Sequence, residues 1–199
     1  MIYIQDNFLP EIIFNKIEPL LIDFKELDVG DKKFYIKPTV EEFENWIKNK
    51  LEILENKKIK CIFSFFRIAT DKLDTDWRIH CDSIINDDIP ERAIVLHFSD
   101  PPNMLTGTAF WEHCDHGYKL ESQDLSTKEF NRILSEDSND LNKWTLNTVI
   151  GQKKNRLLSY PSNYFHSKYP NKVTKEGRKI FVMFYKYKNE RTNINRNKE

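Results

Sequence analysis

Two histidines and one aspartate have the types and the spacing of a metal site. His80 and Asp82 are separated by one residue, and His166 lies far downstream, after a turn that contains proline. On a β-strand, residues i and i+2 point to the same face, so we expect His80 and Asp82 to project together and Cys81 to point away. An isolated His-x-Asp is most often a surface pair, so the prediction depends on His166 as the third ligand. Two imidazoles and one carboxylate leave adjacent coordination positions of an ion open.

These three ligands predict a metal ion but not a reaction. Zinc hydrolases use the same ligand types as iron enzymes that activate oxygen. A hydrolase also needs a general base beside the metal, and no glutamate stands near His80, Asp82 or His166 in the sequence. A metal-dependent hydrolase on a cupin-like barrel and a non-catalytic jelly-roll binding module therefore remain as alternatives to an oxygenase.

Arg178 favours the oxygenase. It opens a strongly β segment, 178–185, twelve residues after His166. We expect an antiparallel return to bring it beside the strand of His166. Alternation places three apolar side chains on the face of Arg178, namely Ile180, Val182 and Phe184. An arginine on an apolar, inward face is costly unless an anion compensates its charge. Because guanidinium matches a carboxylate bidentately, the expected partner is a dicarboxylate cosubstrate. The alternative is an edge-strand arginine that faces water.

The elements around these residues are two helices followed by short β runs. The first helix is expected over 10–21, and the second begins after Thr39, with Glu42 completing a capping box. The β runs are 59–69, 78–85, 92–99, 106–112, 145–150, 156–160, 164–169 and 178–187. Such runs without long helices between them predict a mainly β fold, an antiparallel sandwich or barrel with N-terminal helices.

The 199 residues are expected to form one domain. We divide it into a helical support over 8–56, a β core over 59–187 and a polar tail over 188–199. The segment 121–143 is acid-rich and reads as an insertion, either a lid or a surface excursion. The run from His113 to His116 contains four potential metal ligands, but no distant partner is evident, so a loop at the barrel rim is the preferred interpretation.

Composition limits the partners. The 31 lysines and arginines balance 31 aspartates and glutamates, so neither nucleic acid nor an anionic membrane is favoured by charge. The three cysteines form no disulfide framework. A secretion signal and an apolar stretch of about 20 residues are both missing from the sequence. The sequence therefore predicts a soluble, cytoplasmic protein, and its oligomeric state stays open.

The order His80-x-Asp82, His166, Arg178 resembles the 2-oxoglutarate/Fe(II)-dependent oxygenases, and within them the prolyl-4-hydroxylase-like branch. The resemblance spans about residues 59–187. Residues 93–100 look like the strand that follows the His-x-Asp, 106–110 are similar to a Gly-x-Thr-x-Phe strand entry, and 155–162 look like the strand that leads to the distal histidine. The acidic loop 70–76 departs from that branch, because it lacks the expected Pro-Gly and tyrosine.

This resemblance implies a fold, a reaction and residue roles. The fold would be a double-stranded β-helix, or jelly roll. His80, Asp82 and His166 would hold Fe(II), and Arg178 would bind the C5 carboxylate of 2-oxoglutarate. Reaction with O2 would release succinate and CO2 and hydroxylate a peptide residue or a small metabolite, with ascorbate as a reductant. The retained carboxylate of Asp82 favours hydroxylation over halogenation.

Three further residues are candidates for ligand contacts. His97 stands where that branch often has a tyrosine that binds the cosubstrate, although a structural histidine in the core is an equal alternative. Arg78 has the strand parity of His80 and could touch an anionic substrate. Arg67 is a weaker candidate for the same role. The substrate itself cannot be derived from these residues.

Overall fold

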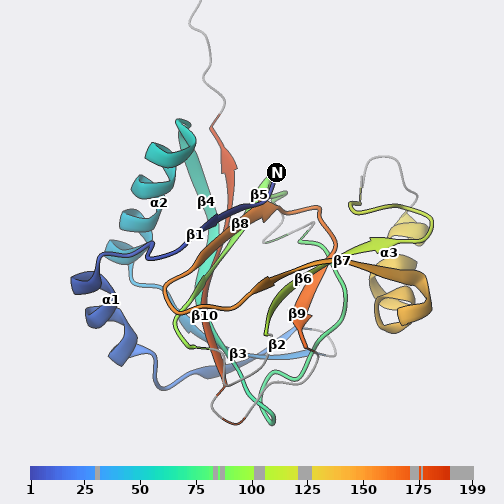
Figure 1. Cartoon of the computed structure of the whole chain (residues 1–199), viewed down its shortest axis with the longest axis horizontal. Helices are drawn as coiled ribbons and strands as arrows, with labels where there is room; N and C mark the ends of the chain where they lie inside the picture. The colour runs from blue at the N-terminus through green and yellow to red at the C-terminus, as the bar shows by residue number, and fades with distance from the viewer. Residues whose placement is uncertain are drawn as a thin grey trace, which may run out of the picture.

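The computed structural model describes residues 1–29, 32–82, 85, 88–100, 106–120, 127–170, 175 and 177–188. Within these ranges the chain forms a seven-stranded sheet in the order β1-β8-β5-β10-β4-β3-β2 and a three-stranded sheet in the order β7-β6-β9. All the strand pairs are antiparallel. This arrangement confirms the predicted mainly β fold with N-terminal helices (Figure 1).

The strands are β1 (Tyr3–Gln5), β2 (Lys25–Val29), β3 (Lys32–Pro38), β4 (Ile59–Ala69), β5 (Arg92–His97), β6 (Gly107–His113), β7 (Trp144–Gly151), β8 (Leu157–Pro161), β9 (His166–Tyr169) and β10 (Arg178–Tyr187). The helices are α1 (Glu11–Ile17), α2 (Glu41–Glu55) and α3 (Thr127–Ser135), with 3-10 turns at Glu18–Leu20, Asp137–Asn139 and Leu141–Lys143.

Strand β10 lies between β4 and β5 and is buried on both faces. Its outward-facing residues, such as Phe181 and Met183, pack in the core beneath α1 and α2. Its inward-facing residues Ile180 and Val182 pack toward Phe110 of the smaller sheet. A strand covered on both faces has an almost continuous apolar sequence, which explains why its bounds were predicted correctly.

Helix α2 covers the outer face of the large sheet (Figure 1). Its buried residues Phe43, Ile47 and Leu51 are four residues apart and form one apolar stripe. The ring centroid of Phe43 lies 5.2 Å from that of Phe181. The predicted capping box is wrong, because Val40 occupies the N-cap position and the Thr39 hydroxyl has no hydrogen-bond partner in the described part of the chain.

The hairpin β2–β3 lies inside the range 8–56, where a helical support was expected. Strand β3 pairs with β4, and β2 forms the edge of the sheet with all five residues exposed. An edge strand that is covered on neither face carries a weak apolar alternation. In addition, charged residues occupy three of the five positions of β2 and three of the seven positions of β3. These two properties explain why the sequence did not reveal the hairpin.

The insertion 121–143 contains α3 and the two later 3-10 turns. Ile133 of α3 packs with Trp144 and Phe165 in a small core of its own. Residues 121–126 of the insertion, and all of the predicted tail except Lys188, lie outside the described residues. Among the helices that the structure describes, none has the length and apolar character that a membrane span requires.

Candidate metal centre

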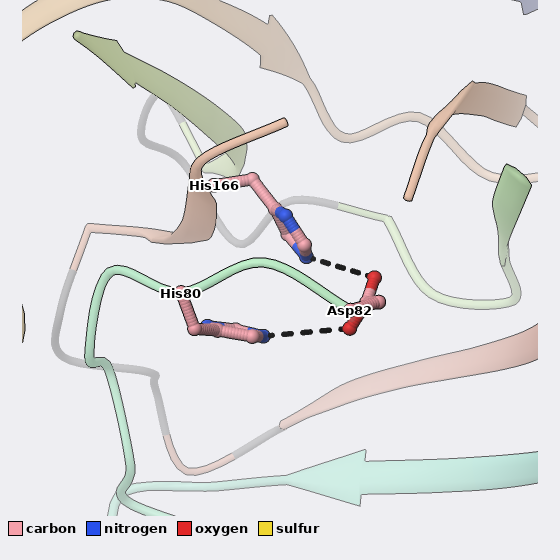
Figure 2. Close-up of side chains that lie close together, drawn as sticks. All are labelled: His80, Asp82 and His166. Atoms are coloured by element: carbon pink, nitrogen blue, oxygen red, sulfur yellow. Dashed lines mark ion pairs between the residues drawn. The ribbon is translucent and has the colours of Figure 1, made fainter. Parts of the chain in front are cut away.

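His80, Asp82 and His166 converge at one end of the space between the two sheets (Figure 2). One ligand atom from each lies within 4.8 Å of the other two. His166 begins β9, and the backbone of His80 forms an isolated bridge with it. The amide of Asp82 donates to the carbonyl of Ser162 at 2.8 Å. The backbone therefore fixes all three residues to the segment that contains β9.

Backbone carbonyls set the tautomer of both imidazoles. Nδ1 of His80 lies 2.8 Å from the carbonyl oxygen of Arg78, and Nδ1 of His166 lies 2.9 Å from that of Tyr164. Because a carbonyl only accepts, Nδ1 donates and Nε2 keeps a lone pair. Both Nε2 atoms face Asp82, at 3.9 Å from Oδ1 for His80 and 3.4 Å from Oδ2 for His166 (Figure 2).

This cluster consists of acceptors, which is what a cation requires. Among the described residues, Asp82 Oδ2 is buried without a hydrogen-bond partner. A buried carboxylate in this state is costly unless a cation compensates it. Burial, with a smaller contribution from the neighbouring His166, lowers the pKa of His80 to about 3, and burial raises the pKa of Asp82. The three residues fit a divalent metal ion.

The sequence analysis missed Tyr160 on β8. Its hydroxyl lies 3.1 Å from Nε2 of His166, and only 2% of the residue is exposed. Burial and the negative charge of Asp82 raise the pKa of Tyr160 well above its usual value, so the phenol stays protonated and can donate to Nε2. The available signal was its place on an inward strand face just before His166.

Arg178 reaches the site from the facing sheet. The prediction that it lies beside the strand of His166 is wrong, because β10 pairs with β4 and β5 whereas β9 belongs to the three-stranded sheet. Gly177 precedes it with φ +77, a conformation that favours glycine. The predicted alternation holds, since every second residue from Arg178 to Phe184 lines the cavity.

The guanidinium of Arg178 is buried and incompletely paired. Its Nη2 donates to Thr108 Oγ1 at 3.1 Å, whereas Nε has no hydrogen-bond partner among the described residues. Burial lowers the pKa of Arg178 to about 10, so the group remains charged at neutral pH. A buried cation with an unused donor is a site for an anion.

His97 is 1% exposed on β5 and pairs with Ile180 of β10. Burial, with the positive charge of Arg178, lowers its pKa well below the usual value, so the ring is neutral. Its Nδ1 has no hydrogen-bond partner in the ranges that the structure describes. His97 is not among the described residues that line the cavity, and a contact with a cosubstrate stays a prediction.

Arg67 and Arg78 both line the cavity and both have carboxylate partners. Arg67 forms a bidentate pair with Asp74, at 2.5 and 2.6 Å, and lies over the ring of Phe34. The Nε of Arg78 donates to Asp76 at 2.9 Å. The acidic loop 70–76, noted in the sequence as a departure, therefore supplies the counter-charges of this wall.

The cavity has a volume of about 660 Å³. Trp77 and Cys81 both line it beside His80. Cys81 also packs with Ile79 and Trp144, which do not line the cavity, in agreement with the prediction that it points away from His80 and Asp82. Residues 77–82 nevertheless form no strand, and His80 makes only an isolated bridge. The orientation of His80 and Asp82 thus comes from the bridge to β9 and not from alternation.

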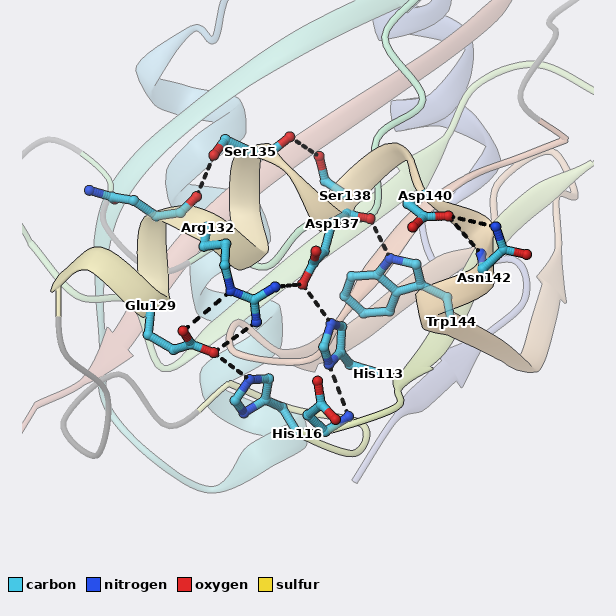
Figure 3. Close-up of polar contacts among 12 residues, drawn as sticks. His113, His116, Glu129, Arg132, Ser135, Asp137, Ser138, Asp140, Asn142 and Trp144 are labelled. Atoms are coloured by element: carbon cyan, nitrogen blue, oxygen red, sulfur yellow. Dashed lines mark hydrogen bonds and ion pairs between the residues drawn. The ribbon is translucent and has the colours of Figure 1, made fainter.

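The run from His113 to His116 serves a different purpose (Figure 3). Nδ1 of His113 accepts from the amide of Asp115 at 3.2 Å, and Nε2 lies 3.1 Å from Asp137 Oδ2. Arg132 of α3 pairs with the same Asp137 oxygen at 2.6 Å. His113, Cys114 and Asp115 come close enough to share an ion, but both nitrogens of His113 are engaged inside the protein. The cluster therefore ties the insertion to β6.

Comparison with known proteins supports the fold. A family described as "Family of unknown function (DUF6445)" matches residues 31–175, and the chain belongs to this family. No curated protein matches the sequence. HygX from Streptomyces hygroscopicus, solved with nickel, 2-oxoglutarate and hygromycin B bound, is similar in structure, with a TM-score of 0.58 and 11% identity over 92% of this chain and 82% of that chain.

Two other solved structures show the same likeness. A Pseudomonas putida prolyl-4-hydroxylase has a TM-score of 0.55 and 12% identity over 94% of this chain and 92% of that chain. The non-heme alpha ketoglutarate dependent epimerase SnoN from nogalamycin biosynthesis has a TM-score of 0.61 and 10% identity over 92% of this chain and 77% of that chain. At such identities the likeness concerns the fold alone. It confirms the predicted resemblance to 2-oxoglutarate/Fe(II) oxygenases and their double-stranded β-helix.

Proposed function

We propose that this member of the DUF6445 family is a 2-oxoglutarate- and Fe(II)-dependent dioxygenase that hydroxylates a small molecule or a peptide residue. The observation that carries the proposal is the pairing of two sites in one cavity. An acceptor cluster formed by His80, Asp82 and His166 lies at the same cavity as the incompletely paired guanidinium of Arg178. A metal ion would compensate the acceptor cluster, and a dicarboxylate would pair with the guanidinium.

The metal would be held by Nε2 of His80, Nε2 of His166 and the carboxylate of Asp82. When bound, Fe(II) with 2-oxoglutarate and O2 supplies an oxidation that releases succinate and CO2 and places one oxygen atom on the substrate. The protein contributes the tautomers of both rings and a buried carboxylate, so that little reorganisation is needed on binding beyond the displacement of the Tyr160 hydroxyl from Nε2 of His166.

Arg178 would bind the far carboxylate of 2-oxoglutarate. Its guanidinium is already oriented by Thr108 at 3.1 Å, and a second acceptor at Nε would complete a bidentate pair. The relatives HygX and SnoN support this role, since the first binds 2-oxoglutarate and the second is named as dependent on it. The mechanism of a metal-dependent hydrolase does not require a buried arginine with an unused Nε donor. A binding module does not require an intact set of three metal ligands.

The test is the visible charge-transfer band that Fe(II) and 2-oxoglutarate give together under anaerobic conditions. We expect a weak band with the full chain, and Asp82→Ala and Arg178→Ala should each weaken it. The conservative variant Arg178→Lys keeps the charge but loses the planar fork, so it should retain part of the band. Zinc binding with no dependence on 2-oxoglutarate would contradict the proposal, as would a failure to release succinate with Fe(II) and ascorbate.

A further inference from the structure

We propose that the cavity binds, as its substrate, a small molecule with an anionic group on an apolar body about the size of one or two rings. The role of this ligand as substrate rests on the proposed function, whereas its chemical class rests on the charge and shape of the cavity. The anionic group is a carboxylate, sulfonate or phosphate, and the apolar body lies against the hairpin β2–β3.

The charge of the described lining is the first argument. Its cationic side chains are Lys32, Arg67, Arg78, Lys168 and Arg178, and its carboxylates are Asp76 and Asp82. Asp74, buried behind the wall, pairs with Arg67 and lies 3.9 Å from Lys168. Even with Asp74 included, five positive charges stand against three negative ones. A concave surface with one sign in excess attracts ligands of the opposite sign.

Loading the site does not remove this excess. Fe(II) and the 2-oxoglutarate dianion carry equal and opposite charges, so they cancel each other. Arg178 would be occupied by the cosubstrate, and Asp82 by the metal. The remaining positive charge lies on the wall formed by Lys32, Arg67, Arg78 and Lys168, where a substrate would face it. A cationic substrate is disfavoured by the same charges.

The apolar surface of the cavity is the second argument. Strand β4 contributes Phe63 and Phe65, and β3 contributes Phe34 and Ile36. Leu27 and Val29 of the edge strand β2 line the mouth, although they remain 39% and 51% exposed. Exposed apolar side chains that point into a cavity gain free energy when an apolar ligand covers them. A volume of about 660 Å³ lies within the range of small-ligand sites.

The two faces of the hairpin β2–β3 differ, because one face lines the cavity and the other faces solvent. Lys32 lines the cavity. Its neighbour Lys33 points to the other face, where its Nζ pairs with Glu26 at 2.7 Å. Adjacent residues of one type thus lie on opposite faces of the same strand. They provide a matched pair of variants, Lys32→Gln and Lys33→Gln, that remove the same charge inside and outside the cavity.

The test compares two fluorescent probes of the same framework. 8-Anilinonaphthalene-1-sulfonate carries one anionic group, and N-phenyl-1-naphthylamine is its neutral counterpart. We expect the full chain to bind the sulfonate at least about tenfold more tightly than the amine. Lys32→Gln should weaken sulfonate binding about threefold, as expected for one charge at close range in water, and should leave amine binding unchanged. Lys33→Gln should alter neither.

A second pair of variants tests the apolar wall. Leu27→Ser should weaken the binding of both probes about threefold, because it removes apolar contact area. Ile53→Ser changes an apolar residue of α2 that is 76% exposed and outside the cavity lining, and it should have no effect. Equal affinity for the two probes overturns the inference, and so does sulfonate binding that Lys32→Gln and Leu27→Ser leave unchanged.

The two proposals fail in different ways. Probe binding needs neither turnover nor metal, whereas the charge-transfer band needs Fe(II) and 2-oxoglutarate. A band without selective sulfonate binding would overturn the ligand class and leave the oxygenase intact. Selective sulfonate binding without a band would overturn the oxygenase and leave an anion-selective cavity. Probe titrations with and without Fe(II) and 2-oxoglutarate therefore distinguish the two.

Discussion

The backbones of His80 and His166 exchange two hydrogen bonds. The amide of His80 donates to the carbonyl of His166 at 3.0 Å, and the amide of His166 donates back to the carbonyl of His80 at 2.8 Å. As a result, the centroids of the two imidazole rings lie 4.5 Å apart. Two candidate ligands that are distant in sequence are therefore held side by side by an isolated antiparallel bridge. Because the protein holds these two ligands together without a metal, the free energy of metal binding should appear as added stability of the folded protein.

Metal binding should raise the melting temperature, and Asp82→Asn should abolish the effect. Metal at about 100 times its dissociation constant stabilises by about 2.7 kcal/mol, which corresponds to about 5–10 °C for a chain of this size. The same variant should make the metal-free protein more stable by about 1 kcal/mol, because it removes a buried charge without a partner. Thermal unfolding with and without anaerobic Fe(II) measures both effects, and an unchanged metal response in Asp82→Asn would refute the role of Asp82.

Arg178→Met should raise the dissociation constant of 2-oxoglutarate by at least about 100-fold. Each hydrogen bond to a charged group contributes about 1.5–3 kcal/mol, and the variant removes a bidentate pair. Thr108→Val removes the partner that orients the guanidinium, so we expect an increase of about tenfold. Titration of the charge-transfer band gives both constants. A normal affinity in Arg178→Met would show that the dicarboxylate binds elsewhere.

Tyr160→Phe should strengthen metal binding by about three- to tenfold. In the metal-free protein the phenol occupies Nε2 of His166 at 3.1 Å, so a metal must displace a hydrogen bond that contributes about 0.5–1.5 kcal/mol. Removing the hydroxyl removes this competition. Competition titrations with a chelator measure the affinity. If the variant binds metal more weakly, the hydroxyl supports the loaded site and does not compete with it.

The structure brings the three predicted ligands together, but partly for a different structural reason than the sequence suggested. Strand alternation was expected to align His80 with Asp82, whereas residues 77–82 form no strand and the bridge to β9 aligns them. By contrast, alternation held for β10, which pairs with β4 in continuous register from Arg178 to Phe184. Tyr160 was missed, because its place on an inward strand face before His166 does not by itself reveal the contact with His166 that gives it its role.

Asp74→Ala should destabilise the protein by about 3–5 kcal/mol. The carboxylate has no exposed side-chain surface and pairs with Arg67, while the Nζ of Lys168 lies against its backbone carbonyl. Breaking a buried pair leaves uncompensated charge in the interior. The double variant Arg67→Met with Asp74→Leu removes both charges, so it should recover most of the loss. Urea unfolding measures each variant, and a double variant no more stable than Asp74→Ala would show that the pair acts through packing.

The metal-free protein should lose stability as the pH falls below about 6.5, and His97→Gln should reduce this loss. The fold lowers the pKa of His97 because it buries the ring beside Arg178. Below the unfolded pKa of about 6.5, the unfolded chain therefore binds a proton that the folded chain does not. Stability then falls with decreasing pH, by about 1.4 kcal/mol per pH unit for one group. Urea unfolding of both proteins between pH 7 and pH 5 measures the two slopes. Parallel slopes would mean that His97 is not held neutral in the fold.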